Sequence, residues 1–240
     1  MIIREKRPFF RGSLMLISFF VLLFIIFMPI FPDENGKGLT GLQYSDNVFN
    51  QLSKGSSYFI PAVIKRLDEV DKSNVSVTVT LKKAEFAQLA AEILRKSGAT
   101  EASSENAQVR FSGNLKTILL SAAQDGDALY HNNGKAVSDK YDGQEPLKVA
   151  TAWWYTLSPT LKELQKQHLI REAEIVDQVI RRAVEPGNNF YSIKPIKVSD
   201  NILLLFSLLA FYLIYTLWYG FSIFELFEGV GLAMTKGKKH

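Results

Sequence analysis

The chain has 240 residues, of which 47% are hydrophobic, and a formal net charge of +4 at pH 7. It contains no cysteine, so thiol catalysis and thiolate metal sites are excluded. The excess of positive charge lies in the two ends of the chain, because residues 32–200 hold 21 basic and 21 acidic residues. The basic pI is therefore no argument for nucleic-acid binding.

The first predicted element is an apolar helix. Ser13–Phe31 carries no charge and follows a basic stretch, REKRPFFR. A signal peptide has the same layout, but the exit MPIFP lacks the small-x-small pattern of a cleavage site. We therefore predict a cytoplasmic tail over residues 1–12 and an uncleaved transmembrane helix over residues 13–31.

A linker and two helical segments are expected next. Residues 32–43 are rich in glycine and turn formers and predict a linker. An extracytoplasmic domain is predicted over residues 44–200. It opens with a helix that KGSS interrupts at Lys54–Ser57, and helix resumes where Phe59, Val63, Leu67 and Val70 form one stripe.

An alternating α and β region follows. Residues 75–81 alternate apolar and polar side chains and give the clearest strand signal in the chain. A helix capped by Gly98, a polar loop ATEASSENA, a shorter strand QVRFSG and a helix from Asn114 complete a β-α-β-α layer with a predicted right-handed crossover. Two strands make a marginal sheet, so residues 190–198 or a neighbouring copy are expected to add a third.

Polar groups in the predicted domain offer weak candidates for a site. DGDALYHNNG (residues 125–134) has oxygen ligands that suit Ca²⁺ but lacks the spacing of an EF-hand loop, and we interpret it as a solvated loop. His168 is predicted to be a hydrogen-bonded core or rim residue. The acidic pairs Asp68–Glu69 and Glu172/Glu174 are assigned to solvent faces. The sequence thus predicts no metal site and no cofactor.

The last part of the predicted domain is helical, from about Glu145 to Glu185. Pro159 stands at an expected helix start, and apolar spacing predicts a long helix over residues 160–184. EPGNN at residues 185–189 is expected to end it.

A second transmembrane helix is predicted over residues 201–224, and a C-terminal tail over residues 225–240. The uncharged run would be about 36 Å long, enough for a hydrocarbon core of about 30 Å. Both tails are basic, so the positive-inside rule places both termini in the cytoplasm and residues 32–200 outside. The predicted location is the inner (plasma) membrane.

The second span carries the predicted site residues, which are membrane-interface contacts. Tyr212, Tyr215 and Tyr219 follow helical spacing and put three hydroxyls on one face, while Trp218 suits an interfacial belt. Glu225 and Glu228 are expected to face headgroups or a basic partner. The hydroxyls could bond to their own backbone, pack against another membrane protein or a second copy, or meet a quinone or haem.

The expected fold class is a membrane protein with two transmembrane helices and an α+β extracytoplasmic domain, made of the small β-α-β-α layer plus long helices. No G-x-S-x-G, phosphate loop, H-E-x-x-H or dinucleotide fingerprint occurs, and we predict that the protein is not an enzyme. The predicted function is a membrane-anchored extracytoplasmic scaffold or accessory subunit, acting as a homo-oligomer or in a larger membrane complex, with no nucleic-acid partner.

The overall plan also resembles, in topology only, that of the polysaccharide co-polymerases. The shared features are two spans, both tails inside, an α+β outer domain and a long outer helix. The proline-rich approach to the second span in that family is represented here by Pro186 and Pro195. The resemblance implies an alternative function, an oligomeric regulator of glycan polymerisation.

Overall fold

The structure is a computed structural model that describes residues 3–32, 36–70 and 74–232. It is mostly helical, with a small α+β content in two sheets. The chain divides into a helix-pair unit (residues 1–56 and 195–240) and an α+β unit (residues 57–194). The predicted basic end of the C-terminal tail lies outside the described residues.

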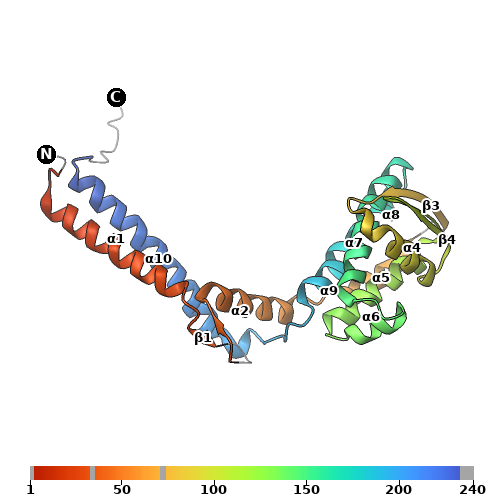
Figure 1. The fold of residues 1–240 in the computed structure, drawn as a ribbon, viewed down its shortest axis with the longest axis horizontal. Coiled ribbons are helices and arrows are strands. Elements are labelled where there is room, and N and C mark those ends of the chain that lie inside the picture. Colours follow the sequence, from red (N-terminus) through yellow and green to blue (C-terminus); the bar gives the residue numbers. More distant parts are fainter. Residues whose placement is uncertain (1–2, 33–35, 71–73, 233–240) are drawn as a thin grey trace. The chain divides into compact units, whose positions relative to one another are not determined.

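The helix-pair unit contains α1 (Lys6–Ile26) and α10 (Ile202–Gly229), which lie side by side (Figure 1). They are antiparallel, because Met15 meets Trp218 while Phe19, further along α1, meets the earlier residue Tyr215. Both helices are long and apolar enough to cross a membrane, judged by length and composition. The predicted spans, 13–31 and 201–224, overlap them, but α1 starts earlier and ends before Pro29, whereas α10 continues past Phe224.

The segment after α1 is more ordered than a linker. Strands β1 (Phe31–Pro32) and β2 (Gly38–Leu39) form a short antiparallel ladder, and α2 (Gly41–Ser56) begins directly after Thr40. Thr40 and Gln43 exchange side-chain and backbone hydrogen bonds at 3.0 and 3.2 Å, a capping box that starts the helix. The predicted break at Lys54–Ser57 is wrong over most of its length, since α2 runs to Ser56.

The α+β unit has one three-stranded antiparallel sheet in the order β3-β5-β4. Strand β5 (Gln108–Asn114) lies between β3 (Asn74–Thr80) and β4 (Ala99–Glu105). The predicted strands at 75–81 and 108–113 are confirmed, but they pair antiparallel, so the predicted crossover between them is wrong. The third strand is β4, which the sequence presents as a polar loop, and residues 190–198 form no strand.

Helices pack against this sheet and against one another. In chain order they are α3 (Ile60–Arg66), α4 (Ala87–Lys96), α5 (Leu115–Tyr130), α6 (Gly134–Lys140), α7 (Pro146–Lys166), α8 (Ile170–Val179), the π-helical segment Ile180–Val184 and α9 (Glu185–Phe190). Short 3₁₀ turns lie at Leu67–Glu69, Ala84–Phe86 and Ser199–Asn201. The predicted cap at Gly98 is confirmed by its φ of +92°. The helix predicted from Asn114 does begin there, and the structure adds that the Asn114 side chain accepts a hydrogen bond from Thr117 N.

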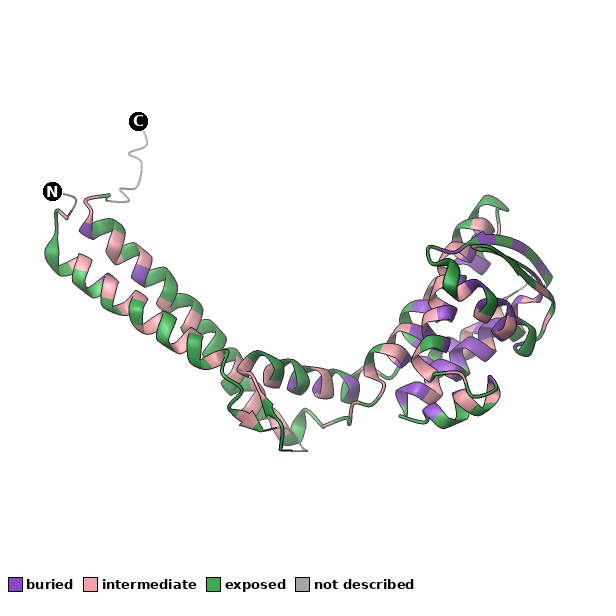
Figure 2. Ribbon diagram, viewed as in Figure 1, coloured by how far each residue is buried: buried purple, intermediate pink, exposed green. Residues whose placement is uncertain are grey.

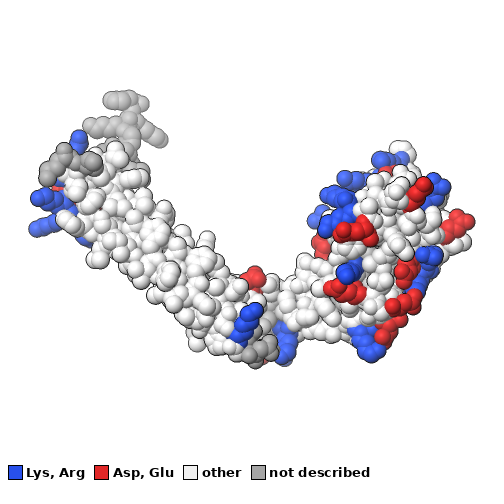
Figure 3. Space-filling view, in the orientation of Figure 1, with Lys and Arg blue, Asp and Glu red and all other residues white. Residues whose placement is uncertain are grey.

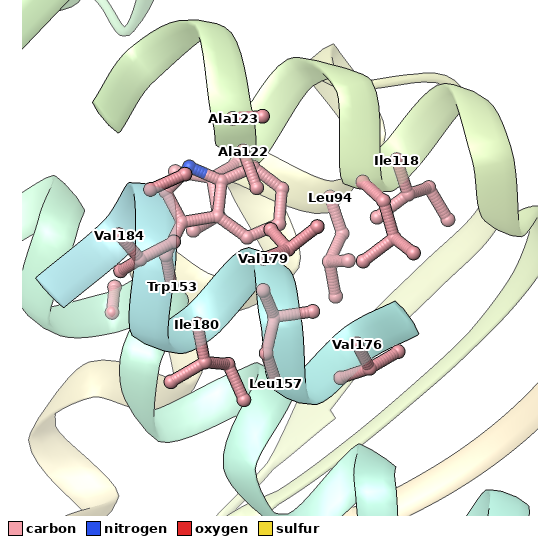
Figure 4. Close-up of a cluster of buried hydrophobic side chains, with 14 of the residues drawn as sticks. Leu94, Ile118, Ala122, Ala123, Trp153, Leu157, Val176, Val179, Ile180 and Val184 are labelled. Atoms are coloured by element: carbon pink, nitrogen blue, oxygen red, sulfur yellow. The ribbon is translucent and has the colours of Figure 1, made fainter. Parts of the chain in front are cut away.

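The core of the α+β unit is built mainly from α4, α5, α7 and α8. Buried residues concentrate along the faces of these helices that point inward (Figure 2). Trp153 is 1% exposed, and its indole lies beside Ala122 and Ala123 of α5 (Figure 4). Small residues on α5 therefore make room for the largest side chain of the core.

The predicted long helix over residues 160–184 is wrong, because the chain turns between α7 and α8. Pro159 lies inside α7 rather than at a helix start. The helix ends at Lys166, and His168 adopts φ +62°, a left-handed conformation that no continuing helix allows. Helix α8 then packs back on α7. EPGNN is also not a stop, since residues 185–190 form α9.

Two glycines let the α5 backbone meet the segment that follows α8. A Cβ on Gly126 would lie 2.5 Å from the carbonyl oxygen of Ala183, and one on Gly187 would lie 2.5 Å from the carbonyl oxygen of Gly126. Real Cβ atoms do not come so close. The contact between α5, the π-helical segment and α9 thus depends on glycine at both positions.

Candidate functional site

The interface between α1 and α10 rests on small residues where the helix backbones approach. A Cβ on Gly12 would lie 2.7 Å from Leu226 N and 2.9 Å from Ser222 O. One on Gly229 would lie 2.6 Å from Phe9 Cα. Such close approach is the usual way in which apolar helices gain contact without a hydrophobic driving force.

Aromatic side chains fill the middle of the same interface. The Phe19 ring stacks on Tyr215 at 4.3 Å between centroids and tilts against Tyr219 at 5.0 Å. The indole N–H of Trp218 donates to the carbonyl oxygen of Met15 at 3.2 Å. Three of the predicted site residues are thereby brought against α1.

The other predicted site residues are placed differently. Tyr212 is 69% exposed, and among the described residues its ring makes no contact with a ring of α1, so the three tyrosines are not packed equally against α1. Glu225 Oε1 lies 3.7 Å from a guanidinium nitrogen of Arg11, and Glu228 is exposed. Their role as membrane-interface contacts stays a prediction.

The Tyr215 hydroxyl differs from the serine and threonine hydroxyls of α10. Like Glu225 Oε2, it is buried and has no hydrogen-bond partner among the residues that the structure describes. By contrast, Ser207, Thr216 and Ser222 each donate to a carbonyl oxygen of their own helix, at 2.7 or 2.8 Å. The reading in which hydroxyls bond to their own backbone thus describes the serines and the threonine of α10, but not Tyr215. Figure 3 shows the flank of the pair without charged residues along most of its length.

The α+β unit contains a buried polar cluster around Asp125, which is 4% exposed. Its carboxylate accepts from Lys140 Nζ at 2.6 Å, Tyr141 Oη at 2.6 Å and Trp153 Nε1 at 2.8 Å. Ser121 accepts from Lys140 and donates to Ser97, at 2.7 Å each. Burial, and then the Asp125 charge, raise the pKa of Tyr141 well above its usual value.

This cluster corrects the prediction of a solvated loop at residues 125–134. Residues 125–130 are the last turns of α5, and both Asp125 oxygens are occupied by donors from the protein. Within the described ranges no group of three His, Asp or Glu side chains could hold a metal ion. The cluster joins α4, α5, α6 and α7.

Two further sequence assignments need correction. His168 is exposed at the turn between α7 and α8, so it is neither a core nor a rim residue. Glu172 is 5% exposed and not on a solvent face. Both errors follow from the assumption of one continuous helix, because the turn at His168 changes which residues of α8 face the core.

An aromatic cluster surrounds Tyr58. Its ring lies 5.2 Å from that of Tyr130 and 5.1 Å from that of His131, and its hydroxyl donates to Asp127 Oδ1 at 2.7 Å. Burial, and then the hydrogen bond to Asp127, raise the pKa of Tyr58 to about 12. The cluster ties the segment before α3 to the end of α5.

Grooves surround Trp154 on the outer side of α7. The largest, about 490 Å³, lies between α7 and β3. A second, of about 290 Å³, lies between α7 and α9, where Trp154 Nε1 donates to Glu185 at 3.0 Å. Sequence reasoning missed these grooves, although the pair Trp153–Trp154 was a signal: neighbouring residues of a helix cannot both point into one core.

No protein-family model, curated protein or solved structure matches the chain. The function is therefore argued from the geometry.

Proposed function

We propose that the protein is a non-catalytic, membrane-anchored scaffold or accessory subunit of a membrane protein assembly. The α1–α10 pair is the anchor, and the α+β unit is the part that works outside the cytoplasm. The observation that carries this proposal is the antiparallel pair itself: two long apolar helices that pack on each other and leave large apolar side chains exposed on their other faces, such as Phe20, Leu203 and Phe206.

Antiparallel pairing supports the proposed orientation. The backbone N–H groups of Arg4 and Glu5 donate to the Gly229 carbonyl oxygen at 2.9 and 3.0 Å, so the start of α1 and the end of α10 meet. Four basic residues lie at or before Arg11, and three more lie between Lys236 and Lys239. A shared basic end favours the cytoplasmic side, with the α+β unit on the other side.

The Tyr215 hydroxyl supports a role in assembly. A buried polar group without a partner costs about 1–3 kcal/mol. Because this chain already covers the hydroxyl, an acceptor from another membrane protein could reach it only if the side chains that cover it moved aside, and such an acceptor would remove that cost. Tyr212 and the exposed apolar faces of both helices offer further area for such a contact.

Regulation of glycan polymerisation stays the second proposal, with reduced support. The resemblance to polysaccharide co-polymerases relied partly on a long outer helix, which a turn at His168 replaces. What remains is the shared two-span plan.

Topology is tested with a reporter that is active only outside the cytoplasm. Gly143 is a suitable insertion point, because it lies in the turn after α6 and no atom lies within 4 Å of a Cβ built there. Activity at Gly143 and silence after residue 240 are expected. Activity after residue 240 would overturn the orientation.

Assembly is tested by purification in mild detergent, followed by native mass spectrometry. A stable complex with another membrane protein, or a defined oligomer, is expected. A monodisperse monomer in native-like lipid discs as well as in detergent would contradict the proposal.

A further inference from the structure

The groove between α7 and β3 has one wall made from the free edge of a sheet. Gln167 Nε2 donates to the carbonyl oxygen of Ser76 at 3.1 Å, so that carbonyl points away from β5. Residues two apart in a strand point their backbone groups to the same side. The N–H and C=O groups of Thr78 and Thr80 therefore face the groove.

The rest of the ladder agrees with this assignment. Leu81 N donates to Ala107 O at 2.8 Å, which places the odd-numbered residues of this stretch on the side bonded to β5 and its turn. Strand β3 is the edge of the sheet, and no other strand in the described ranges pairs with it. Both threonines are exposed and line the groove.

Positive charge dominates the groove. Its lining includes Lys82, Lys162 and Lys166, against a single acidic residue, Glu163. Glu163 is paired with Lys166 at 2.7 Å. Lys82 and Lys162 are exposed and form no ion pair within the described part of the chain, so two positive charges remain uncompensated.

Aromatic rings line part of the groove. Trp154 and Tyr155 line it, and Tyr155 stacks on Phe86 at 5.3 Å, which holds its ring in place. The volume, about 490 Å³, is within the range of about 300–1,000 Å³ that is usual for ligand sites.

We propose that this groove binds an extended acidic peptide segment of a partner protein, which adds to the free edge of β3. The backbone of the segment would exchange hydrogen bonds with Thr78 and Thr80, and its carboxylates would meet Lys82 and Lys162. A nucleic acid or an acidic glycan could use the lysines, but only a peptide backbone matches the alternating donors and acceptors of a strand edge.

The inference deepens the proposed function, because it names the kind of segment that an assembly partner presents. The scaffold proposal and the peptide-binding proposal can be contradicted by different experiments. Peptide binding is measured on the purified full chain, whereas assembly is measured by what is purified with it. A complex without peptide binding would leave the scaffold proposal intact and overturn this one.

The test measures fluorescence anisotropy of a labelled octapeptide that alternates glutamate and valine, with the full chain in detergent. Two control peptides accompany it, one with lysine in place of glutamate and one with alternate amides N-methylated. Binding of the acidic peptide and none of either control is expected. No saturable binding of the acidic peptide up to about 1 mM, the weakest affinity of interest, would overturn the proposal.

Variants separate the backbone contact from the charge contact. Thr78→Pro removes one donor on the free edge, a place where proline is tolerated, and should weaken binding at least threefold. Ser76→Pro is the matched control outside the groove and should leave binding unchanged. Lys82→Gln combined with Lys162→Gln should weaken binding about fivefold and reduce its salt dependence.

One outcome would point to another ligand class, and another would point to damage of the strand. Loss of binding in the lysine variant, with Thr78→Pro and the N-methylated peptide unaffected, would mean a site for any polyanion. Equal loss in Thr78→Pro and Ser76→Pro would mean general damage to the strand. Thermal unfolding of each variant identifies such damage, and the N-methylated peptide tests the backbone contact on the unmodified chain.

Discussion

In the α+β unit, the buried carboxylate of Asp125 accepts hydrogen bonds from three different side chains. In the helix-pair unit, the buried hydroxyl of Tyr215 has no hydrogen-bond partner among the described residues. Both regions use glycine to bring backbones together, at Gly126 and Gly187 in one and at Gly12 and Gly229 in the other. The contrast is between a polar cluster that the α+β unit satisfies with its own side chains and a helix pair that leaves the Tyr215 hydroxyl and Glu225 Oε2 buried without a partner. In the described part of the α+β unit, Gln178 Oε1 is the one buried side-chain atom of this kind.

The largest expected effect is in the Asp125 cluster. Asp125→Ala leaves Lys140, Tyr141 and Trp153 without their acceptor and should lower the free energy of unfolding by about 3–5 kcal/mol. Urea unfolding of the full chain in detergent, followed by near-UV circular dichroism, measures it. Asp139→Ala, which removes a surface ion pair with Lys135, is the control and should cost about 0–1 kcal/mol. Similar losses in both variants would mean that the Asp125 cluster contributes no more to the free energy of unfolding than a surface ion pair does.

The glycine contacts come next. Gly126→Ala or Gly187→Ala should each destabilise the α+β unit by about 1–3 kcal/mol, because the added Cβ meets backbone that must move. Alanine is otherwise the better helix former by about 1 kcal/mol. Gly220→Ala in α10 meets nothing within 4 Å and serves as the matched change, with no loss expected. A stabilised Gly126→Ala protein would refute the close approach.

The packing of the helix pair can be tested directly, since the chain has no native cysteine. Phe19→Cys with Tyr215→Cys should cross-link under mild oxidation, because those rings stack at 4.3 Å. Phe19→Cys with Tyr212→Cys should cross-link several-fold less, because Tyr212 is 69% exposed and lies about one helical turn from Tyr215. Adding Gly12→Leu to the first pair should reduce its yield. Electrophoresis after proteolytic cleavage between the helices measures all three, and equal yields for both pairs would contradict the interface.

Tyr215→Phe sharpens the comparison between the two regions. For the isolated chain we expect no loss of stability, or a gain of about 1 kcal/mol, because the substitution removes an unsatisfied hydroxyl. For a complex in which a partner bonds that hydroxyl, we expect affinity to fall about threefold, from a hydrogen bond worth about 0.6 kcal/mol. Tyr212→Phe is the control. A clear loss of stability in the isolated chain would mean that the hydroxyl is already satisfied within the pair.

The smallest effect concerns pH. The pKa of Tyr58 is raised by burial and by Asp127, so its stabilising contribution is complete below about pH 10 and is lost as the pH rises towards about 12. Asp127→Asn should lower this pKa without restoring the ordinary value, because burial remains. NMR titration of tyrosine Cζ, with Tyr58→Phe for assignment, measures it. An unchanged pKa of Tyr58 in the Asp127→Asn variant would mean that the hydrogen bond to Asp127 does not raise it.

Sequence patterns predicted the elements whose periodicity is strong. The two apolar helices, the alternating strand from Val75 and the helix capped by Asn114 all lie where we expected them. Strand β4 was missed because it is an edge strand whose side chains are mostly exposed, so it carries no alternation. The turn at His168 was missed because apolar spacing continues through it. No residue pattern in the sequence signals that a histidine will adopt a left-handed backbone conformation.

The role of the predicted site residues as membrane-interface contacts stays a prediction, but the helix pair separates residues that the sequence grouped together. Helical spacing grouped Tyr212 with Tyr215 and Tyr219, but the partner helix selects Tyr215 and Tyr219 and leaves Tyr212 outside. The Asp125 cluster could not be predicted, since its donors come from the end of α6 and from α7, and the packing of these helices on α5 is a tertiary property. Asp125 was assigned to a loop because the dipeptide Asp125-Gly126 is typical of turns. In the structure, Gly126 instead lets the backbone of α5 approach Ala183.

The order of synthesis gives the antiparallel pair a consequence of its own. Helix α1 leaves the ribosome first, and its packing partner α10 follows after the whole α+β unit. Until α10 is made, α1 lacks its contacts with that helix. The missing contacts are those of Met15 with Trp218, of Phe19 with Tyr215 and of Gly12 with Ser222. Domains generally fold as units during synthesis, so the α+β unit can be complete while α1 is still unpaired. The hydrogen bond from Arg4 N to the Gly229 carbonyl oxygen can therefore form only after the α+β unit has been synthesised.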